Sequence, residues 1–171
     1  MRSLPSNQHM PSPVLALALF LGIAVSMAEA QAPRPSQRSH LPLEVLADTL
    51  AVCRLPADAP VPLWATGPSR FLTISRTSEE LSITSVQGSV PPGLRCERDY
   101  RAFRVKGPLP LNLIGVLAAI ADPLADAGLS IFAISTFDTD YVLVKARDLE
   151  RALGALERAG HRVSRQGAGG L

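Results

Sequence analysis

The order of strands and helices predicted for residues 101–164 limits the fold of this 171-residue chain more than any other feature of its sequence. In chain order, the predicted elements are a strand at 101–106, a helix at 113–127, strands at 129–135 and 141–146, a helix at 148–159 and a strand at 161–164. This βαββαβ order is that of a ferredoxin-like sandwich, in which two helices cover one face of an antiparallel sheet. We therefore predict an α+β fold.

Both helices are predicted from apolar residues that recur at spacings of three and four. In the first helix this apolar face consists of Val116, Leu117, Ile120, Leu124 and Ala127. Pro123 lies inside the pattern and is expected to bend the helix or to restart it. Gly128 is expected to end the first helix, whereas Asp148 is the predicted N-cap of the second and Gly160 its end.

The first half of the chain repeats this order in a reduced form. Strands are predicted at 43–55 (with a turn at 47–48), 71–75, 81–86 and 95–105. Proline-rich segments at 56–68 and 88–93 stand where the two helices would be. Prolines exclude a long helix in the first segment, and the second is predicted to be a loop or a single helical turn. The first half is therefore predicted to be a degenerate repeat of the second. The resulting organisation is a leader and proline-rich linker (1–40), a degenerate unit (41–104), a complete unit (105–164) and a disordered glycine-rich tail (165–171).

The N-terminal segment carries the pattern of a secretory signal peptide. Arg2 precedes an apolar run at residues 14–25, and Ala28-Glu29-Ala30 offers a cleavage site. The run is too short for a comfortable membrane span, so no membrane anchor is expected in the mature chain. The alternative is that translation starts at Met27 and that the leader is an artefact of start-site assignment.

Cys53 and Cys96 are the only cysteines, and neither has the spacing of a metal-binding motif. In a reducing compartment they would be small buried apolar residues. After export they could form a disulfide, if the fold brings them within bridging distance. Whether the two cysteines form a disulfide is therefore a test of whether the leader is a signal peptide.

Composition and motifs exclude several classes of function. The net charge is +2 with scattered charges, and aromatic residues make up 5% of the chain, which argues against a nucleic-acid platform. No phosphate-binding loop, dinucleotide fingerprint or hydrolase motif occurs. Of the three histidines, His161 follows a helix-ending glycine and is expected to be a surface residue. The sequence therefore predicts no enzyme, no metal and no cofactor.

Residues 135–140, Ser-Thr-Phe-Asp-Thr-Asp, connect two predicted strands as a polar hairpin turn. Asp, Ser and Thr side chains bond their own backbone in such turns. The polar groups would gather at one end of the sheet, where small ligands often bind. The simpler interpretation is a turn that only faces water.

Three segments of the sequence resemble a known family. They are Phe-Leu-Thr-Ile-Ser-Arg-Thr-x-x-Glu-Leu-Ser-Ile at 71–83, the helix and following strand at 115–132, and Ile-Ser-Thr-Phe-Asp-Thr-Asp-Tyr-Val-Leu-Val at 134–144. Together they resemble small bacterial proteins with two tandem ACT domains. These are relatives of the aspartate-kinase regulatory domain and of the cytosolic arginine sensor of the mTOR pathway. The resemblance covers residues 43–163 but not the leader, which favours a misassigned start and a cytoplasmic location, with export as the alternative.

The resemblance implies that an amino acid or similar small ligand binds at an interface between ACT units. The family's ligand loop precedes the first helix and matches residues 112–116 here, so that Asn112, Ile114, Gly115 and Val116 are the expected ligand contacts, with Leu113 in the same loop. Gly115 would let the backbone approach a ligand closely, and N–H groups at a helix start attract a carboxylate. The alternative for Gly115 is a role in packing alone.

The hairpin would supply the opposite wall of this site. Asp140 could pair with an ammonium group, while Thr136 and Phe137 would line the pocket. The alternative for Asp140 is a local cap of the turn, and Asp138 would serve as the mutational control. Two hypotheses result: a non-catalytic regulatory module that binds an amino acid, or an interaction protein whose pocket is filled by its own side chains. In either case a homodimer is compatible with the family.

Overall fold

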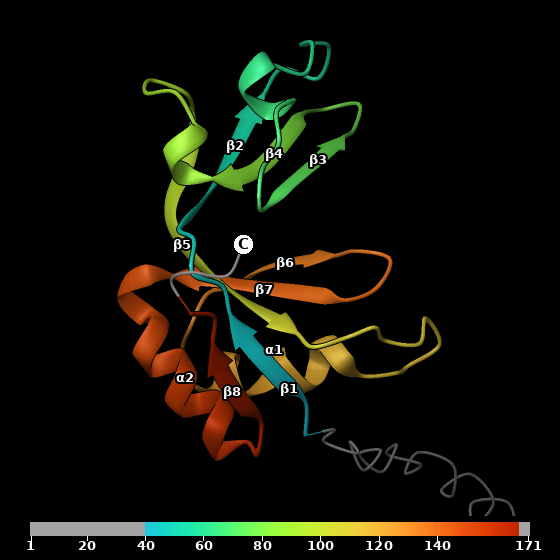
Figure 1. Cartoon of the computed structure of the whole chain (residues 1–171), viewed down its shortest axis with the longest axis vertical. Coiled ribbons are helices and arrows are strands. Elements are labelled where there is room, and N and C mark those ends of the chain that lie inside the picture. Colours follow the sequence, from blue (N-terminus) through green and yellow to red (C-terminus); the bar gives the residue numbers. More distant parts are fainter. Residues whose placement is uncertain (1–39, 168–171) are drawn as a thin grey trace, which may run out of the picture. The chain divides into compact units, whose positions relative to one another are not determined.

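The computed structural model describes residues 40–167, which form a mixed sheet and two α-helices (Figure 1). The strands are β1 (Pro42–Val45), β2 (Leu50–Leu55), β3 (Leu72–Arg76), β4 (Leu81–Val86), β5 (Cys96–Val105), β6 (Phe132–Ser135), β7 (Asp140–Lys145) and β8 (Arg162–Arg165). The helices are α1 (Val116–Asp126) and α2 (Leu149–Arg158), with 3-10 turns η1 (Leu63–Ala65), η2 (Gln87–Ser89) and η3 (Ala146–Asp148). The α+β class is confirmed. The predicted leader and the end of the predicted tail lie outside the described residues.

The second half has the predicted βαββαβ order, and its strands lie side by side as β6-β7-β5-β1-β8. Strand β1, which precedes the first half in the sequence, lies in this sheet between β5 and β8. It pairs antiparallel with β5 and parallel with β8. The sheet is therefore mixed, whereas the sequence predicted a purely antiparallel one. Leu43 and Val45 of β1 are buried, and burial of these side chains stabilises β1 in its position between β5 and β8.

The first half has the same internal arrangement with its helices reduced to single turns. Its first strand, β2, pairs with its third, β4, which pairs with its second, β3. In the second half, β5, β7 and β6 are related in the same way. The 3-10 turns η1 and η2 occupy the positions of α1 and α2 in the chain. This arrangement has the form expected of a degenerate repeat.

Strand β5 belongs to both halves of the sheet. Its first part pairs with β2, and its last part pairs with β7 on one edge and β1 on the other (Figure 1). A bulge separates the two parts, and Asp99 within it has a positive φ of 62°. The domain boundary predicted after residue 104 falls inside this shared strand, so the division into two units stays a prediction.

Both helices pack on one face of the β6-β7-β5-β1-β8 sheet. Their buried side chains contact alternate residues of the strands, as period-two alternation requires. The largest core cluster contains Leu43, Val45, Phe103, Val105, Val142 and Val144 from the strands, Val116, Ile120 and Leu124 from α1, and Leu149, Ala152, Leu153, Ala155 and Leu156 from α2, with Leu41 and Leu129 from loops. The helix periodicity of the sequence therefore identified the buried face, except at Leu117, which is 36% exposed.

Helix α1 begins at Val116, three residues later than the sequence predicted. The preceding segment is a turn in which the Leu113 N–H donates to the Pro110 carbonyl. Pro123 lies within a continuous helix, so of the two outcomes predicted for it, a bend or a restart, the restart does not occur. At the other end the Gly128 N–H bonds the Ala125 carbonyl at positive φ, as expected of a terminating glycine.

His161 is buried, and its predicted surface position is wrong. Only 5% of the residue is exposed. Its Nδ1 accepts a hydrogen bond from the Leu41 N–H (3.1 Å), so Nε2 carries the proton and donates to the Ala119 carbonyl (2.9 Å). The ring thereby connects the chain before β1, helix α1 and the start of β8.

Asp148 occupies the N-cap position of α2 but makes no capping hydrogen bond. Turn η3 leads directly into the helix, so Asp148 has helical dihedral angles that do not suit a cap. Its carboxylate instead accepts a bond from Arg151 (3.1 Å). The boundary of α2 was thus predicted correctly, although the predicted capping bond is absent from the described structure.

The two cysteines, whose state the sequence left open, form a disulfide. Cys53 of β2 lies opposite Cys96 of β5, and their Cα atoms are 4.0 Å apart. Pairing of these two strands therefore determines the contact between the two sulfurs.

Candidate ligand-binding pocket

A pocket of about 450 Å³ lies between the segment that leads into α1 and the β6–β7 hairpin. One wall comes from residues 109–118 and the other from residues 135–140. The lining residues are Leu109, Pro110, Leu111, Leu113, Gly115, Val116, Leu117, Ala118, Ser135, Thr136, Phe137, Asp138, Thr139 and Asp140. The segments that the sequence predicted for the site, residues 112–116 and the hairpin at 135–140, fall within these two walls.

Close contacts between the two walls fix the pocket. The Leu109 N–H donates to the Asp138 carbonyl (2.8 Å), and the Thr139 hydroxyl donates to the Val105 carbonyl at the end of β5 (2.6 Å). The Asp138 carbonyl oxygen would lie 2.7 Å from a Cβ at residue 107, so only glycine fits there without displacement. Hydrogen bonds within the chain therefore hold the two walls of the pocket together.

The first wall ends in the N-terminus of α1. Gly115 is the N-cap residue with a φ of 85°, and its carbonyl accepts the Ala119 N–H (2.9 Å). No side chain in the described part of the chain caps this helix start. A Cβ at Gly115 would meet nothing within 4 Å, so the space beside this backbone is open. The first-turn residues Val116, Leu117 and Ala118 also line the pocket.

The second wall is a two-residue turn with a carboxylate at its base. The Thr136 N–H and the Thr136 hydroxyl both donate to the Thr139 carbonyl (2.8 Å each). The Ser135 hydroxyl donates to Oδ1 of Asp140 (2.5 Å) across the first strand pair. This bond holds the Asp140 side chain in place beside the pocket.

The pocket brings together five of the seven residues that the sequence named for ligand binding: Gly115, Val116, Thr136, Phe137 and Asp140. Asn112 and Ile114 do not line it. Ile114 is 91% exposed, because the loop turns outward before the late start of α1.

Nine lining residues were not named for ligand binding from the sequence: Leu109, Pro110, Leu111, Leu113, Leu117, Ala118, Ser135, Asp138 and Thr139. Of these, Leu113 lies in the predicted ligand loop, and Ser135, Asp138 and Thr139 lie in the predicted hairpin. Ser135 could have been found from the hairpin register, which pairs it with Asp140. Asp138, intended as a control position, lines the pocket and bonds Leu109 through its carbonyl, so it is not a suitable control.

The lining has a one-sided charge. Its described residues include two carboxylates, Asp138 and Asp140, and no lysine, arginine or histidine. Within residues 40–167, no cluster of three or more His, Cys, Asp or Glu side chains could hold a metal ion. No helix in the same range is long and apolar enough to cross a membrane.

Comparison with known families agrees with the fold. An ACT-domain model matches residues 95–158, and a second model, described as an N-terminal domain, matches residues 48–92. The fold and these matches define an ACT-domain protein with a further domain on its N-terminal side.

A solved structure makes the relationship more specific. Protein Atu0741 from Agobacterium tumefaciens is 32% identical, with a TM-score of 0.71 over 77% of this chain and 98% of that one. The chain therefore belongs to the same family as Atu0741.

More distant structures share the fold alone. VC0802 from Vibrio cholerae, described as a protein of unknown function and possible transport protein, is 19% identical, with a TM-score of 0.59 over 72% of this chain and 92% of that one. Aspartate kinase from Synechocystis is also 19% identical, with a TM-score of 0.54 over 75% of this chain but only 28% of the kinase. The fold thus resembles part of an aspartate kinase.

Proposed function

We propose that the protein is a non-catalytic regulatory module and that its pocket binds a free amino acid or a similar small zwitterion. The observation that carries this proposal is the open pocket itself, bounded by an uncapped helix start on one side and carboxylates on the other. An amino acid carries the two complementary charges at its α-carbon.

The start of α1 is suited to the ligand's carboxylate. The first N–H groups of an α-helix have no partner within the helix, and the helix dipole favours negative charge there. Since no side chain caps α1 and Gly115 has no Cβ, a carboxylate can approach these N–H groups.

Asp140 is suited to the ligand's ammonium group. Its Oδ1 is bonded by Ser135, which orients the carboxylate. A charge-assisted bond from an ammonium to such a carboxylate is about twice as strong as a neutral one. Asp138 adds a second negative charge on the same wall.

A catalytic role has little support. The pocket lining contains no histidine, cysteine or lysine, and the Thr136 and Thr139 hydroxyls donate to backbone carbonyls. The Ser135 hydroxyl donates to the Asp140 carboxylate, but the described lining residues include no histidine or lysine that could act as the base of a nucleophilic serine.

The alternative of an interaction protein without a ligand would be favoured by a bulky side chain between Gly115 and Asp140. Both residues instead border the same open space.

We also propose that the two repeats are tandem ACT units and that a second copy covers the pocket. Leu111 (76%), Ile114 (91%) and Phe137 (78%) are highly exposed apolar residues beside the pocket, and their burial would stabilise such a homodimer.

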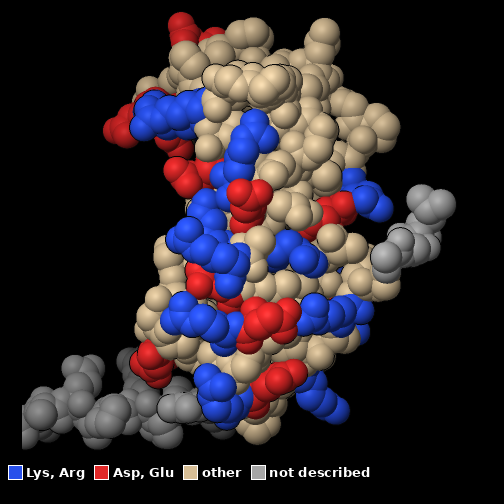
Figure 2. Space-filling view, turned by 90° about the vertical axis from the view of Figure 1, so that its left-hand side faces the viewer, with Lys and Arg blue, Asp and Glu red and all other residues tan. Residues whose placement is uncertain are grey.

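Other partners have less support. Figure 2 shows Lys and Arg interspersed with Asp and Glu on one face, without a region of a single sign. Several of the positive side chains in the described range are paired, for example Arg104 with Glu44 and Arg165 with Glu150. This distribution does not favour nucleic acid, which requires a continuous basic surface.

A thermal-shift screen of the amino acids at millimolar concentration tests the proposal. At a ligand concentration one hundred times Kd, binding stabilises the folded state by about 2.7 kcal/mol. The shift should be lost in Asp140→Asn and retained in Asp58→Asn, an exposed carboxylate outside the pocket lining. If no amino acid raises the melting temperature, or if Asp140→Asn leaves the shift unchanged, the proposal is wrong.

A further inference from the structure

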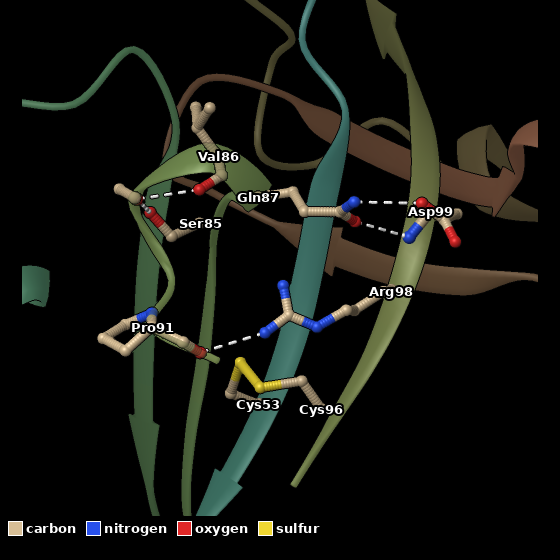
Figure 3. The surroundings of a disulfide bond; sticks show 9 residues. Cys53, Ser85, Val86, Gln87, Pro91, Cys96, Arg98 and Asp99 are labelled. Atoms are coloured by element: carbon tan, nitrogen blue, oxygen red, sulfur yellow. Dashed lines mark hydrogen bonds between the residues drawn. A yellow bond between two sulfur atoms is a disulfide. The ribbon is translucent and has the colours of Figure 1, made fainter. Parts of the chain in front are cut away.

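The disulfide between Cys53 and Cys96 joins the two strands that frame the first half of the molecule (Figure 3). We propose that this disulfide makes the folding of the first half dependent on an oxidising compartment, and that the protein therefore works after export from the cytoplasm. This inference is independent of the ligand proposed above.

The first half has few other sources of stability. The two core clusters that lie wholly within it contain six buried residues, which are Ala51, Cys53, Val90, Ala65, Leu81 and Ile83. A third cluster is shared between the halves and joins Leu46, Leu50 and Phe71 to Ala102 and Leu143. The cluster under helices α1 and α2 contains sixteen. The crossovers of the first half contain only the three-residue 3-10 turns η1 and η2, so no α-helix of residues 40–167 covers its sheet in the way that α1 and α2 cover the other. Units with such small cores commonly depend on disulfides.

The position of the disulfide suits this role. It closes a stretch of 43 residues that contains η1, β3, β4 and η2. A cross-link of this span removes much of the conformational freedom of the unfolded chain. Cys53 is 1% exposed, so one sulfur lies within the small core that it stabilises.

Polar contacts beside the disulfide join the same two regions. Gln87 and Asp99 exchange two hydrogen bonds, from Gln87 Nε2 to Asp99 Oδ1 (2.9 Å) and from the Asp99 N–H to Gln87 Oε1 (2.7 Å). Arg98 donates to the Pro91 carbonyl (3.0 Å). Figure 3 shows both contacts above the sulfur–sulfur bond, that of Arg98 with Pro91 nearer to it than that of Gln87 with Asp99. The exposed pairs are open to competition from water, so we assign the dominant restraint to the disulfide.

The oxidation is simple to balance. Two thiols lose two electrons and two protons and form one sulfur–sulfur bond, while a disulfide oxidant accepts them and is released as two thiols. Because the chain has no third cysteine, only one intramolecular pairing exists.

Disulfides persist in the periplasm and outside the cell, whereas the cytoplasm keeps thiols reduced. The sequence offers a leader with Ala28-Glu29-Ala30, which lies outside the described residues. The cytoplasmic location favoured from family resemblance is therefore replaced here by its exported alternative.

Fractionation tests the compartment. The full chain, expressed in a Gram-negative host, is isolated from periplasm and cytoplasm under acid quench and treated with an alkylating agent without reductant. We expect the periplasmic protein to begin after residue 30 and to take up no alkyl group. Protein that stays in the cytoplasm with its leader uncut and both cysteines alkylated overturns the proposal.

A second experiment tests the dependence of the first half on the bond. Reductant should lower the melting temperature of the oxidised protein by about 10 °C and open residues 56–95 to protease, while residues 105–165 stay protected. The double variant Cys53→Ala/Cys96→Ala is the matched control, because reductant should have no effect on it. If complete reduction leaves both the melting temperature and the protease cleavage pattern unchanged, the disulfide is dispensable and the proposal is contradicted.

Discussion

The imidazole of His161 supplies the hydrogen bond that Pro123 removes from helix α1. Proline has no N–H, so the Ala119 carbonyl, four residues earlier, lacks its helical partner. His161 Nε2 donates to this carbonyl (2.9 Å), while Nδ1 accepts from Leu41. The hydrogen bond from His161 explains how α1 continues past Pro123 without leaving the Ala119 carbonyl unpaired.

A double-mutant cycle should detect this relationship. His161→Ala should lower the free energy of unfolding by about 2–4 kcal/mol, because it leaves the Leu41 N–H and the Ala119 carbonyl buried without partners. Pro123→Ala should recover about 1 kcal/mol more in the His161→Ala protein than in the wild type, because residue 123 regains its N–H. Urea unfolding of the four proteins measures this coupling.

The control cycle combines His161→Ala with Pro91→Ala, which lies in an exposed loop before β5. These two changes should be additive within about 0.5 kcal/mol. Equal coupling in both cycles would show that His161 does not compensate for Pro123.

Gly107 should determine the spacing of the two pocket walls. In Gly107→Ala the new Cβ would lie 2.7 Å from the Asp138 carbonyl, which must move and weaken its bond to the Leu109 N–H. We expect a loss of about 1–3 kcal/mol in stability together with weaker ligand binding. Gly67→Ala, where a Cβ meets nothing within 4 Å, is the matched control and should change neither. Calorimetry and a ligand titration on both variants distinguish the outcomes.

The two leucines Leu124 and Leu63 should differ sharply on substitution by alanine. Leu124 of α1 is fully buried in the core beneath the sheet, and Leu124→Ala should lose about 3 kcal/mol through the cavity that it leaves. Leu63 of η1 is 89% exposed, and Leu63→Ala should change stability by less than about 0.5 kcal/mol. A large loss at Leu63 would mean that its side chain is covered in solution.

Ile114 should report whether a second copy covers the pocket. A charge at this 91% exposed position would be buried without a partner in the proposed homodimer, so Ile114→Asp should shift the protein to monomer. Leu63→Asp is the matched control and should leave the association state unchanged. Sedimentation velocity at several protein concentrations gives the result, and identical behaviour of the two variants would argue against an interface at Ile114.

Local patterns in the sequence predicted most of the elements. Apolar periodicity identified the buried faces of α1 and α2, and the polar turn at 136–139 identified the β6–β7 hairpin. The prolines of residues 56–68 correctly excluded a long helix before β3. These features depend on residues a few positions apart, which is the range over which periodicity and turn chemistry act.

The sequence by itself thus determined the order of elements, the hairpin and the two segments that border the pocket. The tertiary structure alone decided that β1 enters between β5 and β8, that His161 is buried, that Cys53 meets Cys96, and which side chains line the pocket. Each of these depends on residues far apart in the chain, such as Leu41 and His161 at a separation of 120 residues. Their contact follows from burial of the whole sheet, and no local spacing encodes it.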